Sequence, residues 1–394
     1  MKTITLLILM TILTTTTALA AVDHRPPENF HQFKTPFVLL QEGVFAMAYQ
    51  EGTLWGMVDQ TGQLVYSSNQ GESWGLAHTF PDIIQGIYFD QVGNMFVSTS
   101  QNRWGATPTG AIHRSTNGGA SFTTVLSGMS GAAVHWNFAS LDGTMFVSEY
   151  GFKWHGDNAR RIYRSLDFGQ TWAVVFDPGP IYNYHHHRII IAEAGVVYQA
   201  VGDGGNAQII RSTNNGNTWE VVATRYQPTS AIVFDTHILW GLDGGPYYGV
   251  MRYCRSTGAI SRSLTVPAPF ASSNYDMLYA NGIVYAMFLS YGGYVHPASI
   301  FYSRNAGETW HLLGYIDKAP GWGVGLLSIV ACPRYAYVAI TTPIYHGGQM
   351  ENNFYGTLRF RLLPPHQKAV TAKVHFTNTK DLHPAQAQKL WEKL

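Results

Sequence analysis

Histidine, tyrosine and arginine side chains gather in four polar stretches near the middle of this chain, at residues 134–137, 149–161, 182–188 and 244–248. Each stretch lies between segments whose apolar residues alternate, so the polar groups are expected on loops between strands. Histidine is suited to proton transfer near neutral pH, tyrosine serves as acid or base when its pKa is shifted, and arginine binds a carboxylate through two hydrogen bonds. The stretches therefore predict a site that handles protons and anionic groups.

Three chemistries could use these residues. The first is β-elimination on a uronic acid, which needs a group that neutralises the carboxylate, a base that removes the C5 proton and an acid that protonates the leaving O4. The second is metal binding by His185 and His187, because alternate residues of a strand point to the same side. The third is hydrolysis by two carboxylates. No pair stands out by position among the nearest carboxylates, which are Glu149, Asp157, Asp203 and Asp243.

An eight-residue motif, S-x-D-x-G-x-T-W, recurs along the chain and organises the elements that must position these loops. Copies start at residues 67, 115, 165, 212 and 303, and the copy at 165–172 keeps every fixed residue. The Asp or Asn side chain can hold a tight turn, Gly takes the φ > 0 position, and Trp buries a large surface between neighbouring repeats. The motif resembles the Asp-box of sialidase-type β-propellers, which is a structural element and says little about chemistry.

The spacing of the motifs predicts an all-β fold, a seven-bladed β-propeller. Four copies are about 48 residues apart, and the last gap is about twice as long, with a decayed copy at residues 255–258. In the blade that contains the copy at 165, strands are expected at residues 135–140, 144–149 and 162–164. The last blade, residues 326–363, lacks a fourth strand, so the N-terminal residues 37–40 are expected to supply it and close the ring. Third strands of the seven blades are expected near Leu64, Ile112, Ile162, Ile210, Arg252, Phe301 and Arg359.

Composition and charge limit the classes of partner. Charged residues make up 12% of the chain and aromatic residues 14%, and 40 residues are glycine, as in a turn-rich β protein. The formal net charge of +1 gives no support for nucleic-acid binding. A polyanionic substrate must therefore meet a local basic site.

The two ends of the chain are predicted to lie outside the propeller domain, residues 21–363. Residues 1–20 have the form of a secretory signal peptide, with Lys2, an apolar run at residues 6–13 and a small-residue cleavage site ending at Ala20. The apolar run is too short to span a bilayer, so we expect export to the periplasm or the medium without a membrane anchor. Residues 364–394 form a short C-terminal tail with a helix expected at residues 384–394. Cys254 and Cys332 fall in non-adjacent blades and are expected to be free thiols.

The repeated Asp-boxes, the segment Glu149-Tyr150-Gly151 and the pair His135 and His155 look like those of secreted seven-bladed propeller polysaccharide lyases. These are the ulvan lyases and the related rhamnose-glucuronate lyases, and the resemblance covers most of the mature chain at the level of the fold. It implies an acidic polysaccharide as the partner, β-elimination as the reaction, and no organic cofactor. A bound zinc or calcium ion, structural or neutralising, is compatible with it.

Carried over to this chain, the resemblance implies that His135 and His155 are catalytic, that Tyr184 or Tyr247 is the second proton-transfer residue, and that Arg188 neutralises the uronate. Substrate contacts are expected from Trp136, Trp154, His187, Tyr248, Asn158 and Arg160. Two alternatives stay open, a sialidase-type glycoside hydrolase and a glycan-binding propeller without catalysis. The resemblance to sialidases is weaker, because their Arg-Ile-Pro segment is missing before the first box.

Overall fold

A computed structural model describes residues 38–41, 43–101, 109–151, 159–181, 184–244, 248–267, 270, 272–289, 298–316, 325–346 and 349–364. Contacts within the chain divide it into two units, Met1–Gln32 and Phe33–Leu394, and all described residues belong to the second. The predicted signal peptide and the predicted tail helix lie outside the described residues. No helix in these ranges is long and apolar enough to cross a membrane.

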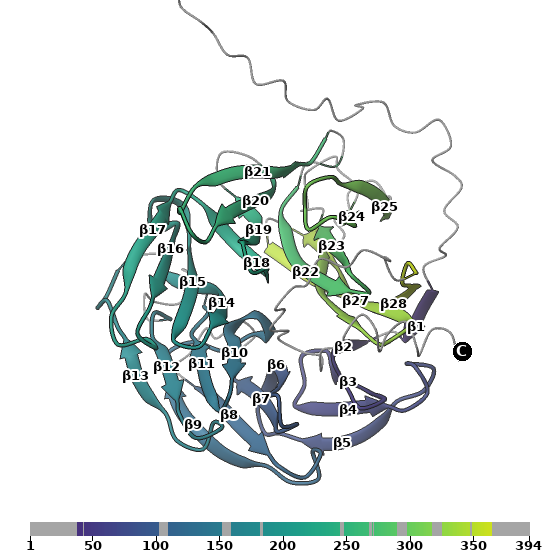
Figure 1. Ribbon diagram of the computed structural model, residues 1–394. Coiled ribbons are helices and arrows are strands. Elements are labelled where there is room, and N and C mark those ends of the chain that lie inside the picture. Colours follow the sequence, from purple (N-terminus) through teal and green to yellow (C-terminus); the bar gives the residue numbers. More distant parts are fainter. Residues whose placement is uncertain are drawn as a thin grey trace, which may run out of the picture. The chain divides into compact units, whose positions relative to one another are not determined.

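Seven four-stranded antiparallel sheets form the blades of a β-propeller in this second unit (Figure 1). The innermost strands of most successive blades contact one another, and that of the second blade contacts the short helix that precedes that of the third. The strand that opens the first blade also contacts the one that opens the last. The predicted seven-bladed propeller is therefore confirmed.

The first four blades take their strands in chain order. Blade 1 contains β2 (Val44–Gln50), β3 (Thr53–Val58), β4 (Gln63–Ser67) and β5 (Gly75–Thr79). Blade 2 contains β6 (Ile83–Phe89), β7 (Met95–Ser100), β8 (Gly110–Ser115) and β9 (Thr123–Met129). Blade 3 contains β10 (Phe138–Leu141), β11 (Thr144–Ser148), β12 (Ile162–Ser165) and β13 (Ala173–Phe176). Blade 4 contains β14 (His185–Glu193), β15 (Val196–Gly202), β16 (Gln208–Ser212) and β17 (Glu220–Thr224).

The remaining blades follow the same plan, except that the last one borrows a strand. Blade 5 contains β18 (Gln227–Val233), β19 (His237–Gly244), β20 (Gly249–Cys254) and β21 (Ile260–Thr265). Blade 6 contains β22 (Asn274–Ala280), β23 (Ile283–Phe288), β24 (Ala298–Ser303) and β25 (His311–Ile316). Blade 7 contains β26 (Gly325–Ala331), β27 (Tyr335–His346), β28 (Gln349–Arg361) and β1 (Val38–Gln41). Two short 3-10 helices are described, η2 (His135–Asn137) and η4 (Gly204–Asn206).

The N-terminal strand closes the ring, as predicted from the incomplete last blade. β1 pairs with β28, and Val38 lies opposite Arg359. Thr357 then joins blade 7 to blade 1, because its hydroxyl accepts a hydrogen bond from the Ala46 amide at 2.9 Å and donates one to the Val44 carbonyl at 2.8 Å. Closure removes the open edges that a partial ring of sheets would expose.

The Asp-boxes form the turns between third and fourth strands. In the copy at 165–172, the Ser165 hydroxyl donates to Asp167 at 2.7 Å and accepts from the Gly169 amide at 2.9 Å. Gly169 has φ of 74°, and a Cβ there would collide with the ring of Phe96 in the preceding blade. Each box thus fixes its own turn and seats it against the neighbouring blade, which explains why the motif recurs at the period of the blades.

The third strands lie where the spacing predicts, but the inner strand of blade 3 begins later than expected. Strand was predicted from His135, whereas η2 occupies residues His135–Asn137 and β10 starts at Phe138. The Asn137 side chain accepts a hydrogen bond from the Val134 amide at 3.1 Å, which turns the chain before the strand. Cys254, which is half-buried, and Cys332, which is buried, are both free thiols.

Candidate functional site

The polar stretches and the Asp-boxes lie at opposite ends of the blades. An Asp-box follows the third strand of an antiparallel blade, so it shares a face with the end of the first strand. The start of each first strand and the end of each second strand must then lie on the other face. Residues 134–137, 149–150 and 184–188 occupy these positions, which is where a propeller presents its functional loops.

Three buried charged or titratable side chains meet from blades 3, 4 and 6. Nη2 of Arg188 lies 2.5 Å from Oδ1 of Asp276, and Nε2 of His135 lies 3.7 Å from Oδ2 of the same carboxylate. Each of the three residues exposes 5% of its surface or less. Burial raises the pKa of Asp276, but Arg188 and His135 outweigh it, so the pKa stays below its usual range. Asp276 is therefore an anion that faces an imidazole and is held by a guanidinium.

The short helix η2 places His135 where several blades converge. Asn137 anchors the helix, since its amide donates to the His187 carbonyl at 2.7 Å and to the Ser148 hydroxyl at 2.9 Å. Residue 86 must be glycine in this arrangement, because a Cβ there would lie 2.7 Å from the His135 amide nitrogen. Burial lowers the pKa of His135 below 6.5, although Asp276 acts in the opposite direction.

His135 also lines a small, partly open pocket. Blades 1, 2 and 7 supply the other walls, which are apolar apart from Asp59, Gln60 and Gln85. One imidazole thus stands between an accessible pocket and a buried carboxylate, an arrangement that suits a proton-transfer group.

A band of aromatic rings runs from His135 toward blade 4. Trp136 contacts the ring of His135 edge-on at 4.6 Å and contacts Tyr150 and Tyr275 at 5.5 and 5.6 Å between ring centroids. Tyr150 in turn lies 5.1 Å from the ring of His185. Burial raises the pKa of Tyr150 well above 10, and Tyr275 and two nearby carboxylates raise it further. Tyr150 is therefore a protonated phenol at neutral pH.

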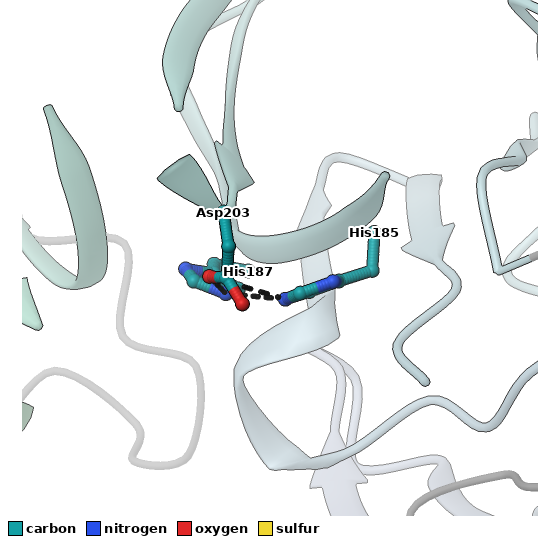
Figure 2. Close-up of side chains that lie close together, drawn as sticks. All are labelled: His185, His187 and Asp203. Carbon is teal, nitrogen blue, oxygen red and sulfur yellow. Dashed lines mark hydrogen bonds and ion pairs between the residues drawn. The ribbon is translucent and has the colours of Figure 1, made fainter. Parts of the chain in front are cut away.

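The band ends at a cluster of two histidines and a carboxylate, shown in Figure 2. The Nε2 atoms of His185 and His187 are 2.8 Å apart, and Oδ1 of Asp203 lies 3.6 and 3.7 Å from them. Burial lowers the pKa of both histidines, so both rings are neutral and at least one nitrogen lone pair faces the cluster. These residues could hold a metal ion, since the three ligand atoms lie within 4.8 Å of one another.

A second carboxylate lies beyond Asp203. The side-chain amide of Gln227 lies 2.5 Å from Oδ1 of Asp203 and 3.3 Å from Oδ2 of Asp243. Burial raises the pKa of Asp243 to about 7, with a smaller contribution from Asp203. One amide thus bridges two carboxylates in unlike environments, a pairing that sequence position does not reveal.

The other carboxylate candidate within the described residues, Glu149, has a structural role. It accepts hydrogen bonds from the amides of Ser130, Arg160 and Arg161 at 2.8 to 3.1 Å and from the Tyr163 hydroxyl at 2.9 Å. It is fully buried, and it holds the β11–β12 connection in place.

The structure brings together His135, Trp136, His187 and Arg188 among the residues predicted for the site. The Arg188 guanidinium forms an ion pair with Asp276, which also faces His135. Arg188, predicted to neutralise the uronate, thus contacts a carboxylate of the protein itself. Tyr184 lies on the other side of the strand from His185 and His187, in the core between blades 3 and 4, where it contacts His186. Arg160 pairs with Asp177 at 2.7 Å, and Tyr248 is exposed at the β19–β20 connection. The remaining predicted residues lie outside the described part of the chain: His155, Tyr247, Trp154 and Asn158.

Asp276 and Gln227 lie outside the polar stretches selected from the sequence, and Asn137 lies within one of them but was given no role. A signal existed for Asp276, because a carboxylate inside the apolar strand Asn274–Ala280 needs a buried partner. Asn137 and Gln227 carried no comparable signal, since each has a partner in another blade, the His187 carbonyl and the Asp203 carboxylate respectively.

Comparison with known proteins agrees with the fold. The BNR/Asp-box repeat family matches residues 301–312, and no curated protein matches the chain. Among solved structures, the chain is similar to a streptogramin B lyase, with 11% identity, 85% of this chain and 99% of that chain covered, and a TM-score of 0.57. It is similar to YCF48 from Cyanidioschyzon merolae, with 14% identity, coverage of 82% and 98%, and a TM-score of 0.53.

A GH74 xyloglucanase from Xanthomonas campestris is also similar, with 13% identity, a TM-score of 0.54, and 82% of this chain and 56% of that chain covered. At such identities the likeness shows the fold alone. A propeller built from BNR repeats fits a protein that acts on glycans.

Proposed function

We propose that this protein cleaves an acidic, uronate-containing polysaccharide of the rhamnose-glucuronate type by β-elimination. The observation that carries the proposal is the placement of His135, which lines a pocket and is backed by the buried pair Asp276 and Arg188. A histidine held neutral in this way can accept a proton near neutral pH. Of the neighbouring aromatic residues, Trp136 and Tyr150 are buried, and the partly buried Tyr275 is the one suited to meet the apolar face of a sugar ring.

In this reaction His135 removes the C5 proton of the uronate, and the electron pair forms the C4–C5 double bond as the C4–O4 bond breaks. Tyr150 is the described residue best suited to protonate the leaving O4, because its phenol is protonated and both it and His135 contact Trp136. Water is not consumed, so the product carries an unsaturated uronate at its new non-reducing end.

The test follows the ultraviolet absorbance of unsaturated uronate while the purified protein acts on ulvan and on other uronate polymers. We expect absorbance to rise with the wild-type protein and the rate to fall roughly 10²–10⁴-fold in His135→Gln and in Tyr150→Phe. His311→Gln serves as the matched control, because it removes an exposed histidine from β25, an outer strand. Circular dichroism establishes that each variant is folded. A wild-type protein that releases no unsaturated product from any of the polymers would contradict the proposal.

A second candidate, glycoside hydrolysis, is favoured by the bridged carboxylates. Asp243 has the raised pKa of a general acid, and Asp203 lies close by, joined to it through Gln227. New reducing ends without unsaturated product, lost in Asp243→Asn and kept in His135→Gln, would favour this reaction. Binding of the polymer with neither product would favour a glycan-binding propeller.

We further propose export, on the basis of the signal-like residues 1–20. N-terminal sequencing of the protein after expression in a secreting host would give Ala21 as the first residue. An N-terminus at Met1 on protein recovered from the cytosol would contradict this.

A further inference from the structure

We propose that His185, His187 and Asp203 bind a divalent first-row transition-metal ion of the zinc class, with a coordination position left open for water or an anionic oxygen. The inference rests on the geometry of this cluster and does not depend on the reaction proposed above.

The separations between the three ligand atoms match those around a single ion. Zinc bound at about 2.0–2.1 Å in a tetrahedral site places neighbouring ligand atoms about 3.3 Å apart. The two Nε2 atoms are 2.8 Å apart, and Oδ1 of Asp203 lies 3.6 and 3.7 Å from them. The observed distances between ligand atoms therefore lie on both sides of the expected distance. Shifts of about half an ångström would bring all three atoms to zinc distance.

Strand geometry explains why these residues converge. His185 and His187 alternate on β14, so their side chains leave the same side of the strand. Gly202, the last residue of β15, lies opposite His185 in the sheet, and Asp203 follows it directly. A Cβ at residue 202 would lie 2.5 Å from Cε1 and 2.6 Å from Nε2 of His187, so the cluster requires glycine there.

The surroundings have the features of a metal site. The Gln227 amide donates to Asp203 and so orients the carboxylate, as residues behind metal ligands commonly do. The side chains of His185 and His187 are 5% and 2% exposed, whereas that of Asp203 is 36% exposed, which leaves an entry path from solvent. None of the described contacts of Asp203 is with lysine or arginine.

The donor set selects the class of ion. Calcium and magnesium prefer oxygen ligands, whereas two imidazole nitrogens and one carboxylate oxygen suit zinc, iron, cobalt or nickel. Without an ion, one histidine would donate a hydrogen bond to the other, and the cluster would have only a structural role. A metal site and a purely structural histidine pair would differ in their affinity for Zn²⁺, which can be measured directly.

The experiment uses full-length protein carrying an affinity tag free of histidine, stripped with a chelator and dialysed. Calorimetry with Zn²⁺ and visible absorption with Co²⁺ should each give one equivalent bound, and Zn²⁺ should raise the melting temperature. We expect Asp203→Asn and His187→Gln to weaken Zn²⁺ affinity by at least about tenfold. His311→Gln should bind like the wild type.

Asp203→Asn keeps the test decisive if the histidine variant fails to fold, because the Asp203 side chain is partly exposed and the amide preserves its shape. Two outcomes would overturn the inference. The first is wild-type protein that is folded and binds no stoichiometric Zn²⁺ or Co²⁺. The second is Zn²⁺ affinity unchanged in Asp203→Asn. Either result leaves the lyase assay unaffected, since that assay reports on His135 and Tyr150.

Discussion

Nε2 of His135 in blade 3 lies 3.7 Å from Oδ2 of Asp276 in blade 6. The separation is too long for a hydrogen bond, and because burial lowers the pKa of His135, the contact is one between a carboxylate and a neutral imidazole. The other oxygen of Asp276 lies 2.5 Å from Arg188, and Oδ2 also accepts a hydrogen bond from the Ile329 amide of blade 7 at 3.2 Å. The carboxylate thus ties four blades together and fixes the environment of the proposed base.

Replacing Asp276 with alanine should destabilise the protein strongly. The change leaves the buried Arg188 without its carboxylate, and breaking a buried ion pair in this way costs roughly 3–5 kcal/mol. The free energy of unfolding, measured with guanidinium chloride, gives the loss.

The pair Arg211 and Glu220 supplies a matched control for this prediction. Its Nη2–Oε1 distance is also 2.5 Å, but the two side chains are 27% and 57% exposed. Glu220→Ala should therefore cost only about 0–1 kcal/mol. Equal losses in Asp276→Ala and Glu220→Ala would show that burial of the first pair has no energetic consequence.

Mild acid should destabilise the folded protein through its buried histidines. Burial lowers the pKa of His113, His135 and His237 below 6.5 in the folded protein. As pH falls below 6.5, the unfolded chain takes up protons first, so stability that is present above 6.5 is lost on acidification. Each such histidine should contribute to the loss, and about 1.4 kcal/mol per pH unit is the upper limit for one group.

Unfolding free energies at about pH 7.5 and about pH 5 would measure this slope. His237→Gln should reduce it, because glutamine can still donate to the Ala306 carbonyl, which His237 Nε2 meets at 3.0 Å, but does not titrate. A free energy that does not change over this interval would contradict the predicted protonation.

The fold could be predicted because the same turn-forming residues recur in each repeat. Ser, Asx and Gly of the box form hydrogen bonds within one turn, so all the partners lie close together in the sequence.

The site could be predicted only in part. His135 and Arg188 stood out as polar residues beside aromatic or apolar ones, but Asp276, which joins them, is 88 residues from Arg188, and only the closed ring brings it near. Tyr184 was carried over from the resemblance to the lyases, yet the two-residue period that pairs His185 with His187 turns it toward the core.

The Asp-box at residue 167 should tolerate an amide better than a methyl group. Asp167 accepts hydrogen bonds from the Ser165 hydroxyl at 2.7 Å and from the Thr171 amide and hydroxyl at 2.9 and 2.6 Å. Asparagine keeps the accepting oxygen, as it does in the other four boxes, so Asp167→Asn should change stability by less than about 1 kcal/mol. Asp167→Ala removes every acceptor and should cost roughly 1–3 kcal/mol. Melting temperatures of the two variants compare them directly, and a greater loss in Asp167→Asn would contradict the assigned role.

Adding one methyl group at Gly202 should disturb the histidine cluster more than the rest of the blade. A Cβ there meets the His187 ring at 2.5 and 2.6 Å, and overpacking of this kind costs roughly 1–3 kcal/mol. Gly205, three residues on, has nothing within 4 Å of the same added atom, so Gly205→Ala is the matched control and should change stability little. Denaturant unfolding measures both changes. Because the methyl group displaces His187, Gly202→Ala should also lose Zn²⁺ affinity while remaining folded, whereas Gly205→Ala should retain it. Equal Zn²⁺ affinity in the two variants would mean that the close approach of residue 202 does not position His187.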